Sequence, residues 1–406
     1  LWINVRSSQH WGDDFSVYIN QTQNIISGNR FDSSTYIYDP LICSAVPSAP
    51  VGFSLLLVPV YQLFGFNMYA LSLYLSIIYV AWAMLCYALF RRQFSCDVSL
   101  LIVIATFYPN FMLWLKLLIC SDVPFSMWIT AGFLLWTEED SFKLPKVLAA
   151  ILFFLIALIT RAPAIVLLPA ALSWMLYRST VFKGLRSGYP AFLLIVFLLL
   201  GYILINHVIF PPRFRYESYT IGAFSVTKMG NNLLQNSVLY SKEFFSLYTT
   251  DTKHLHELSL LFAGVLLIVS IVSLFIQLFR RGSLLDWFVI FYLIMILTYK
   301  YTADYRYIAP VHPFLLMYAA MALQVLVEKL SISKLMMKIS VVVFLFVIFS
   351  KHTTYLAQTT SDTVPGPYED IAQKTFAYLH NNFDQKETIA FNKPRALALF
   401  SGVSTT

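Results

Sequence analysis

The chain has 406 residues, of which 58% are hydrophobic and only 12% are charged. Roughly a quarter of the residues in soluble domains are charged, so this composition excludes an ordinary soluble protein and indicates an integral membrane protein. The net charge of +7 needs no nucleic-acid partner, because basic residues beside membrane spans are its usual source. The 4 cysteines have no metal-binding spacing.

Residues 1–67 are predicted to form a loop outside the membrane with two juxtamembrane helices. Asp13 and Asp14 precede an amphipathic pattern over residues 15–26, and a proline-rich stretch from Pro47 to Pro59 leads into the second helix. Helix capping explains one of these acids, since Asp is a good N-cap residue. A second acid beside a bilayer needs another reason, and the pair is therefore a candidate site.

Many apolar blocks approach the length of roughly 20 residues that a membrane span needs, or the shorter length of a re-entrant helix. The blocks are residues 68–90, 98–119, 123–136, 147–160, 163–177, 189–209, 258–279, 285–302, 306–327 and 335–356. We therefore expect an all-α polytopic bundle over residues 68–356, with about 10–11 transmembrane helices.

Short basic linkers between alternate spans predict the orientation of this bundle. They contain Arg91 and Arg92, Lys143 and Lys146, Arg178, Lys183 and Arg186, Arg280 and Arg281, and Lys329, Lys334 and Lys338. Such turns face the cytoplasm in multi-pass proteins. The opposite face then carries residues 1–67, the turns near Asp122, Arg161 and Arg306, the outer loop 210–257, and the tail from residue 357.

Charged residues in the short turns of that opposite face are further candidates. Asp122 lies at a turn after Lys116, where capping the helix that follows is an equal alternative for the acid. Arg161 interrupts an apolar stretch that is too long for one span, and it either binds an anion or extends to the lipid headgroups. Charge at this depth is costly unless it is paired or bound to a ligand.

Arg306 lies between two predicted spans and has the planar guanidinium that binds phosphate through two hydrogen bonds. Tyr305 or Tyr307 would add a hydrogen bond to the same anion. The structural alternative is an aromatic belt with an ion pair between Asp304 and Arg306. His312, further along, fits a buried core histidine better than a base and is left unassigned.

The tail, residues 357–406, changes in composition and is predicted to start a small α/β domain. Helical spacing covers residues 368–383, residues 388–391 have the character of a strand, and residues 394–400 form another helix. One strand is too little for a sheet, so we expect this domain to continue beyond the end of the chain.

Together these positions place acids and cations on one face of a membrane bundle. Acids that deprotonate a hydroxyl group and cations that hold a phosphate leaving group are the parts of a transferase with a phosphorylated lipid donor. The sequence has no Walker loop or Rossmann fingerprint for a nucleotide on the cytoplasmic side. A donor delivered within the membrane is therefore favoured.

In their order along nearly the whole chain, these motifs resemble those of the GT-C glycosyltransferases. That superfamily includes the dolichyl-phosphate-mannose protein mannosyltransferases and the bacterial lipid A aminoarabinose transferases. The matching motifs are Asp13 with Asp14, the stretch from Pro47 to Pro59, Asp122 with Pro124, Arg161, and Arg306 with Tyr307 and Pro310. Two features depart from the family: Ser48, Ala49 and Pro50 replace a lysine of the aminoarabinose transferases, and the lumenal insert of the mannosyltransferases is missing.

The resemblance implies a membrane enzyme that moves a sugar from a polyprenyl-phosphate donor to a hydroxyl group of a lipid, glycan or protein acceptor. Membrane lipids are expected partners and nucleic acid is not. It implies inversion at the sugar, with Asp13 as the general base and Asp14 as its neighbour. The donor-phosphate candidates are Arg161, Arg306, Tyr305 and Lys116, and Asp122 would position the acceptor. No cofactor follows, although a divalent cation at Asp14 and Asp122 stays open. The expected location is the bacterial inner membrane, with the site on its periplasmic face.

A transporter or flippase of lipid-linked sugars is the main alternative. It predicts polar or broken helices near the middle of the bilayer and inverted repeats, whereas the charges here gather at the ends of spans and no repeat is evident. A scaffold protein is a third interpretation, and it would leave the outer acids replaceable.

Overall fold

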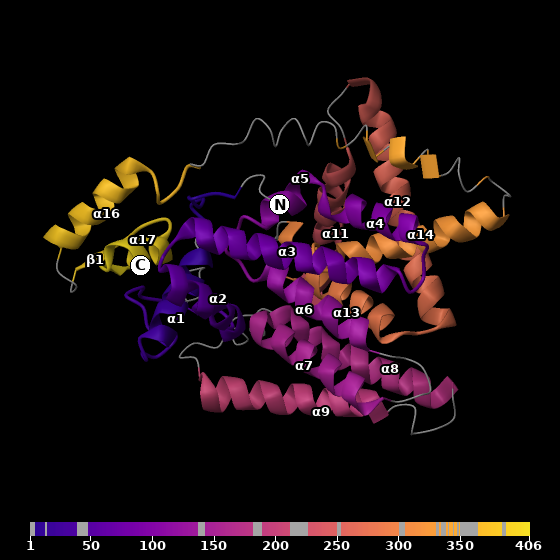
Figure 1. Cartoon of the computed structure of the whole chain (residues 1–406), viewed down its shortest axis with the longest axis horizontal. Helices are drawn as coiled ribbons and strands as arrows, with labels where there is room; N and C mark the ends of the chain where they lie inside the picture. The colour runs from indigo at the N-terminus through magenta and orange to yellow at the C-terminus, as the bar shows by residue number, and fades with distance from the viewer. Residues whose placement is uncertain are drawn as a thin grey trace.

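The computed structural model describes residues 5–12, 14–38, 48–136, 143–181, 189–211, 226–249, 253–299, 305–329, 364–383 and 387–406, with single residues between 333 and 349. These residues form a helical bundle with a two-stranded sheet at one end (Figure 1). The chain is an integral membrane protein of the all-α polytopic class, as the composition predicted.

The elements are as follows in chain order. The outer segment contains α1 (Asp14–Ile26) and α2 (Val51–Phe64). The bundle begins with α3 (Met68–Phe90), α4 (Cys96–Phe107), α5 (Asn110–Leu115), α6 (Asp122–Leu135), α7 (Leu144–Thr160), the 3-10 helix η1 (Ala162–Val166) and α8 (Leu167–Val181). It continues with α9 (Tyr189–Ile203), the π-helix η3 (Leu204–Ile209), α11 (Val226–Tyr248), α12 (Lys253–Arg280), α13 (Leu284–Thr298), the 3-10 helix η4 (Tyr305–Tyr307) and α14 (His312–Lys329). The tail contains α16 (Asp370–Asn382), β1 (Thr388–Ile389), α17 (Pro394–Ser401) and β2 (Ser404–Thr405).

Three helices in the described part of the chain are long and apolar enough to cross a membrane: Met68–Phe90, Tyr189–Ile209 and His256–Arg280. Shorter apolar helices, among them α6 and α7, accompany them. One predicted span was wrong. The block 98–119 is not one helix, because Pro109 starts a new helix after α4 has ended. The outer loop 210–257 contains the long helix α11.

Close contacts between α3, α6 and α7 form the centre of the bundle. The indole nitrogen of Trp82 on α3 donates a hydrogen bond to the hydroxyl of Thr130 on α6 at 3.1 Å. Gly132 on α6 lies against the ring of Phe154 on α7, where a Cβ atom would overlap with the ring. These contacts bring α6 close to both of its neighbours, and they fix the position of the turn that precedes it.

The two ends of α6 face opposite sides of the bundle. Asp122 is its first residue, whereas Arg92 donates a hydrogen bond to the carbonyl oxygen of Leu134 near its last turn. Lys338 forms an ion pair with Asp97 in the first turn of α4, a few residues after Arg92. The basic linkers at 91–92 and 338 therefore lie at the end of the bundle away from Asp122.

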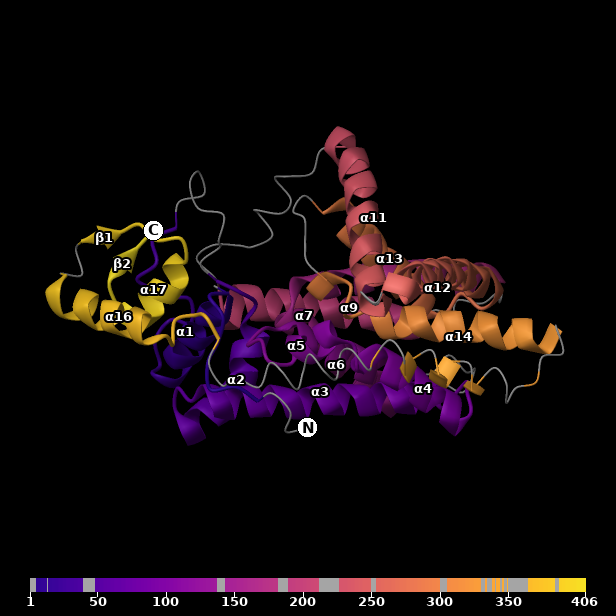
Figure 2. The same ribbon diagram turned by 90° about the horizontal axis from the view of Figure 1, so that it is seen from above.

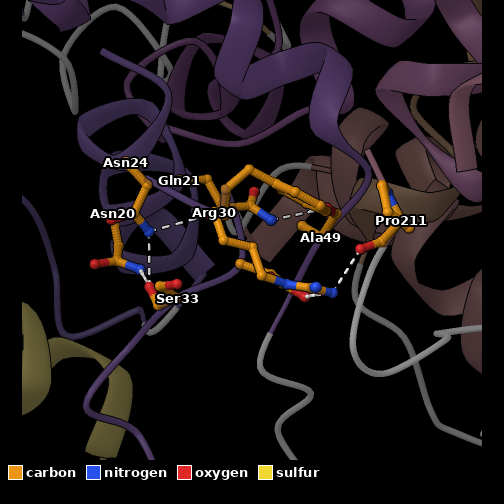
Figure 3. A network of polar contacts seen from close by, with 9 residues as sticks. Asn20, Gln21, Asn24, Arg30, Ser33, Ala49 and Pro211 are labelled. Atoms are coloured by element: carbon orange, nitrogen blue, oxygen red, sulfur yellow. Dashed lines mark hydrogen bonds and ion pairs between the residues drawn. The ribbon is translucent and has the colours of Figure 1, made fainter. Parts of the chain in front are cut away.

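Hydrogen bonds within the first loop hold it against α1 (Figure 3). The side-chain amides of Asn20 and Asn24 both donate to the carbonyl oxygen of Ser33, at 2.6 and 2.7 Å. Arg30 donates to the carbonyl oxygen of Pro211 at 2.6 Å, just after η3. The loop after α1 is thus linked to the start of the outer loop.

The tail packs on the first loop, and both views place α17 beside α1 (Figures 1 and 2). β1 and β2 pair in parallel, and Tyr36 of the first loop forms a bridge with Thr405. The amide of Ile37 donates to the carbonyl oxygen of Thr405 at 2.7 Å. The prediction of a single strand was therefore wrong, because a second strand, β2, follows α17 and pairs with β1. α1 lies between α2 and α17, and most of it is buried.

Candidate active site

Asp14 is the first residue of α1, and its carboxylate contacts two arginines from distant parts of the chain. Nη1 of Arg306 in η4 lies 3.2 Å from Oδ2, and Nη2 of Arg395 in α17 lies 3.1 Å from Oδ1. The Asp14 side chain is 49% exposed, whereas the side chains of Arg306 and Arg395 are 23% and 12% exposed. The carboxylate is thus held on both oxygens and still reaches the surface.

The charge state of Asp14 follows from these contacts. Burial alone would raise the pKa of the carboxyl group, but the positive charges of Arg395 and Arg306 outweigh it and lower the pKa below its ordinary value. Asp14 is therefore ionised at neutral pH. A carboxylate that two guanidinium groups stabilise in this way is a weak proton acceptor.

Asp122 forms a second ion pair, which is much more buried. Nη1 of Arg161 lies 2.5 Å from Oδ1 of Asp122, and the two side chains keep 13% and 1% of their exposure. Arg161 follows the last residue of α7 in an extended conformation, which ends that helix before η1 begins. Its guanidinium also lies 5.0 Å from the centre of the Tyr307 ring, within the range of a cation–π contact.

Tyr18 connects the two ion pairs. It lies one turn after Asp14 on the same face of α1, and its hydroxyl is 2.9 Å from the hydroxyl of Ser121. Ser121 also lies 3.4 Å from Nη1 of Arg161. Burial raises the pKa of Tyr18, and the negative charge of Asp14 raises it further, so the phenol stays protonated.

These contacts define one group of side chains, which we call the charged cluster. It consists of Asp14, Tyr18, Ser121, Asp122, Arg161, Arg306, Tyr307 and Arg395. Its members come from α1, the turn before α6, the turn after α7, η4 and α17. Four of the charged residues that the sequence singled out are therefore neighbours in space.

The remaining predicted residues lie elsewhere or outside the description. Asp13 directly precedes α1 and lies outside the described residues. Lys116 follows α5 and is buried, with 6% of its surface exposed. The ring of Tyr305 faces the core and not Arg161, and its centre lies 4.6 Å from the centre of the Phe111 ring. One of these two tyrosines was expected beside the cations, and Tyr307 is the one that lies there.

Comparisons with known proteins point to one fold. No protein-family model and no curated protein matches the sequence. Among solved structures, ArnT from Cupriavidus metallidurans bound to undecaprenyl phosphate matches with a TM-score of 0.60 and 11% identity, over 99% of this chain and 82% of that one. The archaeal oligosaccharyltransferase AglB from Archaeoglobus fulgidus, in complex with an inhibitory peptide and a dolichol-phosphate, matches with a TM-score of 0.59 and 12% identity, over 100% of this chain. This chain spans 61% of the AglB length.

The chain has the GT-C fold. Identities of 11–12% mean that the arrangement of the elements is what this chain shares with both proteins. Within the GT-C fold of this chain, the charged cluster lies where the outer segment and the tail meet the bundle.

Sequence reasoning missed Arg395, the member of the charged cluster that comes from the tail. The only local signal was the helix predicted at residues 394–400, which begins with Pro394 and places Arg395 in its first turn. That pattern does not predict that the helix packs against α1. The contact arises from the packing of the GT-C bundle and the tail around α1.

The carboxylates of the charged cluster are poorly suited to a metal ion in this arrangement. Both oxygens of Asp14 and one oxygen of Asp122 already contact arginines, whose charge repels a cation. Within the described residues, no group of three or more His, Cys, Asp or Glu side chains has the geometry to hold a metal. We derive no step through a divalent cation.

Proposed function

We propose that the chain is a membrane glycosyltransferase that moves a sugar from a polyprenyl-phosphate donor to a hydroxyl-bearing acceptor. The observation that carries the proposal is the convergence of Arg306 and Arg395 on the half-exposed Asp14, beside the buried pair of Asp122 and Arg161. Guanidinium groups at the edge of a bundle suit a lipid phosphate, because they bind its oxygens through paired hydrogen bonds. The matches to ArnT with bound undecaprenyl phosphate and AglB with dolichol-phosphate support this class of donor.

The proposed reaction is a single in-line displacement. Asp13 accepts the proton of the acceptor hydroxyl while the acceptor oxygen forms a bond to the anomeric carbon of the sugar. The bond from that carbon to the phosphate oxygen breaks, and its electron pair leaves with the polyprenyl phosphate. Attack from the side opposite the leaving group inverts the anomeric centre.

The base is assigned to Asp13 rather than Asp14 on electrostatic grounds. Both oxygens of Asp14 accept hydrogen bonds from arginines, and the positive charges of these arginines lower the pKa of its carboxyl group. Asp13 is the adjacent acid in the chain, directly before the start of α1. Asp14 then serves to hold Arg306 in position.

Arg306 is the first choice for the leaving phosphate, because the acid that it contacts, Asp14, is half exposed, whereas the guanidinium of Arg161 contacts the buried Asp122. Charge that develops on the leaving oxygen would be stabilised by a cation already in place. Asp122 and Arg161 would fix Tyr307 and the turn at Ser121 around the acceptor. Lys116 stays a proposal for the donor side.

The proposed location is the bacterial inner membrane, with the charged cluster on the periplasmic face. The basic linkers at 91–92 and 338 lie at the opposite end of the bundle, as expected of cytoplasmic turns. The acceptor class, whether lipid, glycan or protein, is left open by this arrangement.

The direct test is to incubate the purified protein with a panel of polyprenyl-phosphate sugars and candidate acceptors, and to identify the consumed donor by mass spectrometry. We expect one donor to release polyprenyl phosphate together with a glycosylated acceptor. A second sample in vesicles measures movement of lipid-linked sugars across the bilayer. Movement without any hydrolysis or transfer would favour a transporter and reject the proposal.

A further inference from the structure

The tail of the chain places a guanidinium group beside one that belongs to the bundle. Arg395 on α17 and Arg306 in η4 contact different oxygens of the same Asp14 carboxylate, at 3.1 and 3.2 Å. Two guanidinium groups that contact the same carboxylate repel each other, so their convergence needs negative charge nearby. The Asp14 carboxylate supplies part of that charge, and its side chain is half exposed.

We propose that Arg395 is a second ligand of the donor phosphate, so that the tail completes a phosphate site whose other half is Arg306. The proposal rests on the function proposed above and adds to it a residue from outside the bundle. The ligand class is a phosphate ester with at least one negative charge, carried by a polyprenyl chain. Asp14 acts as the bridge that sets the spacing of the two guanidinium groups.

Arg395 is held rigidly enough for such a role. The hydroxyl of Thr405 donates to the carbonyl oxygen of Pro394 at 2.8 Å, which anchors the first turn of α17 to β2. Thr405 is in turn paired with the first loop through its contacts with Thr35 and Ile37. The Arg395 side chain keeps only 12% of its exposure, so little conformational freedom is left to lose when an anion binds.

The chemistry of arginine supports two simultaneous contacts. A guanidinium group has five N–H donors in a fixed plane, so one arginine can contact a carboxylate and a second anion at the same time. Two such groups at one carboxylate present donors from two directions to an anion that approaches its exposed side. A leaving phosphate gains charge as the sugar departs, so a pair of cations stabilises the product more than the donor.

A purely structural role for Arg395 is the competing explanation, since its ion pair also links α17 to α1. The two roles differ in what they change. A phosphate ligand affects the KM for the donor and the inhibition by the product, whereas a docking contact affects the attachment of the tail. The amide of Ile37 reports on that attachment, because it donates to Thr405.

The experiment compares the wild-type protein with Arg395→Gln, Arg395→Lys and the control Lys374→Gln, which removes a charge from the exposed face of α16. Transfer kinetics are measured together with binding of undecaprenyl phosphate and dolichyl phosphate in detergent. Hydrogen exchange of the peptide that contains Ile37 is followed in the same samples.

We expect Arg395→Gln to raise the KM for the donor and to weaken polyprenyl phosphate binding, each by on the order of 10-fold to 100-fold. Arg395→Lys should lie between it and the wild type, because it keeps the charge and loses the planar fork. The KM for the acceptor and the exchange of Ile37 should stay unchanged, and Lys374→Gln should behave as the wild type.

Normal donor kinetics and phosphate binding in Arg395→Gln would overturn the inference and leave the proposed function intact. Faster exchange at Ile37 with equal effects on donor and acceptor would also overturn it, in favour of a docking contact. If the wild type binds polyprenyl phosphate without transferring a sugar and Arg395→Gln weakens that binding, the proposed function fails while the phosphate site stands.

Discussion

The two acids of the charged cluster differ in burial and in the origin of their partners. Asp122 is 1% exposed and pairs with Arg161, which lies in a neighbouring turn of the bundle. Asp14 is 49% exposed, and its partners come from η4 and from the tail. A buried pair is costly to break, whereas an exposed one exchanges partners with solvent and ligands. We infer that Asp122 and Arg161 stabilise the site and that Asp14, Arg306 and Arg395 face the substrate.

Removal of Asp122 should have the largest effect on folding. Asp122→Ala leaves Arg161 as a buried charge without its partner, which costs about 3–5 kcal/mol in proteins. The thermal unfolding midpoint in detergent should fall sharply. Asp97→Ala breaks an exposed pair at the opposite end of the bundle and serves as the control, with a much smaller shift. Equal shifts in the two variants would show that burial of the pair contributes little.

Removal of Arg306 should affect the donor more than the fold. Arg306→Ala deletes a cation that is partly exposed, and we expect the KM for the donor to rise on the order of 10-fold to 100-fold. Arg306→Lys should recover part of this loss. Steady-state kinetics with varied donor and fixed acceptor measure the effect. A loss of thermal stability as large as that of Asp122→Ala would instead place Arg306 among the structural residues.

Acid should weaken the contact between Asp14 and the two arginines. Because the folded state lowers the pKa of Asp14 below its ordinary value of 3.8, this contact contributes fully above that pH and is lost as the pH falls through the lowered value. Energy transfer between site-specific labels at residues 37 and 378 reports on docking of the tail. It should stay constant from neutral pH down to about 5 and fall in stronger acid. Asp14→Asn should remove that part of the pH dependence, and an identical acid profile in this variant would contradict the assignment.

The smallest effect should come from the hydroxyl of Tyr18, which links the two ion pairs. Tyr18→Phe removes the hydrogen bond with Ser121 and should destabilise the protein by about 1 kcal/mol. Tyr378→Phe, at a side chain that is 60% exposed, is the matched control and should unfold at the wild-type temperature. A change of catalytic rate without any change in stability would contradict this structural role and place Tyr18 in the reaction instead.

Much of the site was predictable because its charges stand out in an apolar chain. Asp14, Asp122, Arg161 and Arg306 lie in short turns on one predicted face, and the positive-inside rule alone brings them to the same side. The ends of α7 and α17 also follow from local signals. The approach of these turns to one another depends on how the helices pack, which a pattern of hydrophobic residues does not specify.

Three features depend on contacts that local patterns do not contain. Arg395 meets Asp14 only because α17 docks on α1, far away in the sequence. Tyr305 and Tyr307 are two positions apart in η4, where the 3-10 geometry turns one ring into the core and the other toward Arg161. The sheet is completed by Tyr36 and β2, and strands as short as two residues carry little periodicity.

Substitution of Asp13 tests the central claim most directly. With the donor identified by the panel, Asp13→Asn should reduce transfer by about 100-fold or more, since general-base catalysis contributes 10²- to 10⁴-fold. Its unfolding midpoint and its binding of polyprenyl phosphate should match those of the wild type. Transfer by Asp13→Asn at the wild-type rate would contradict the account of an acid-assisted glycosyl transfer at this face.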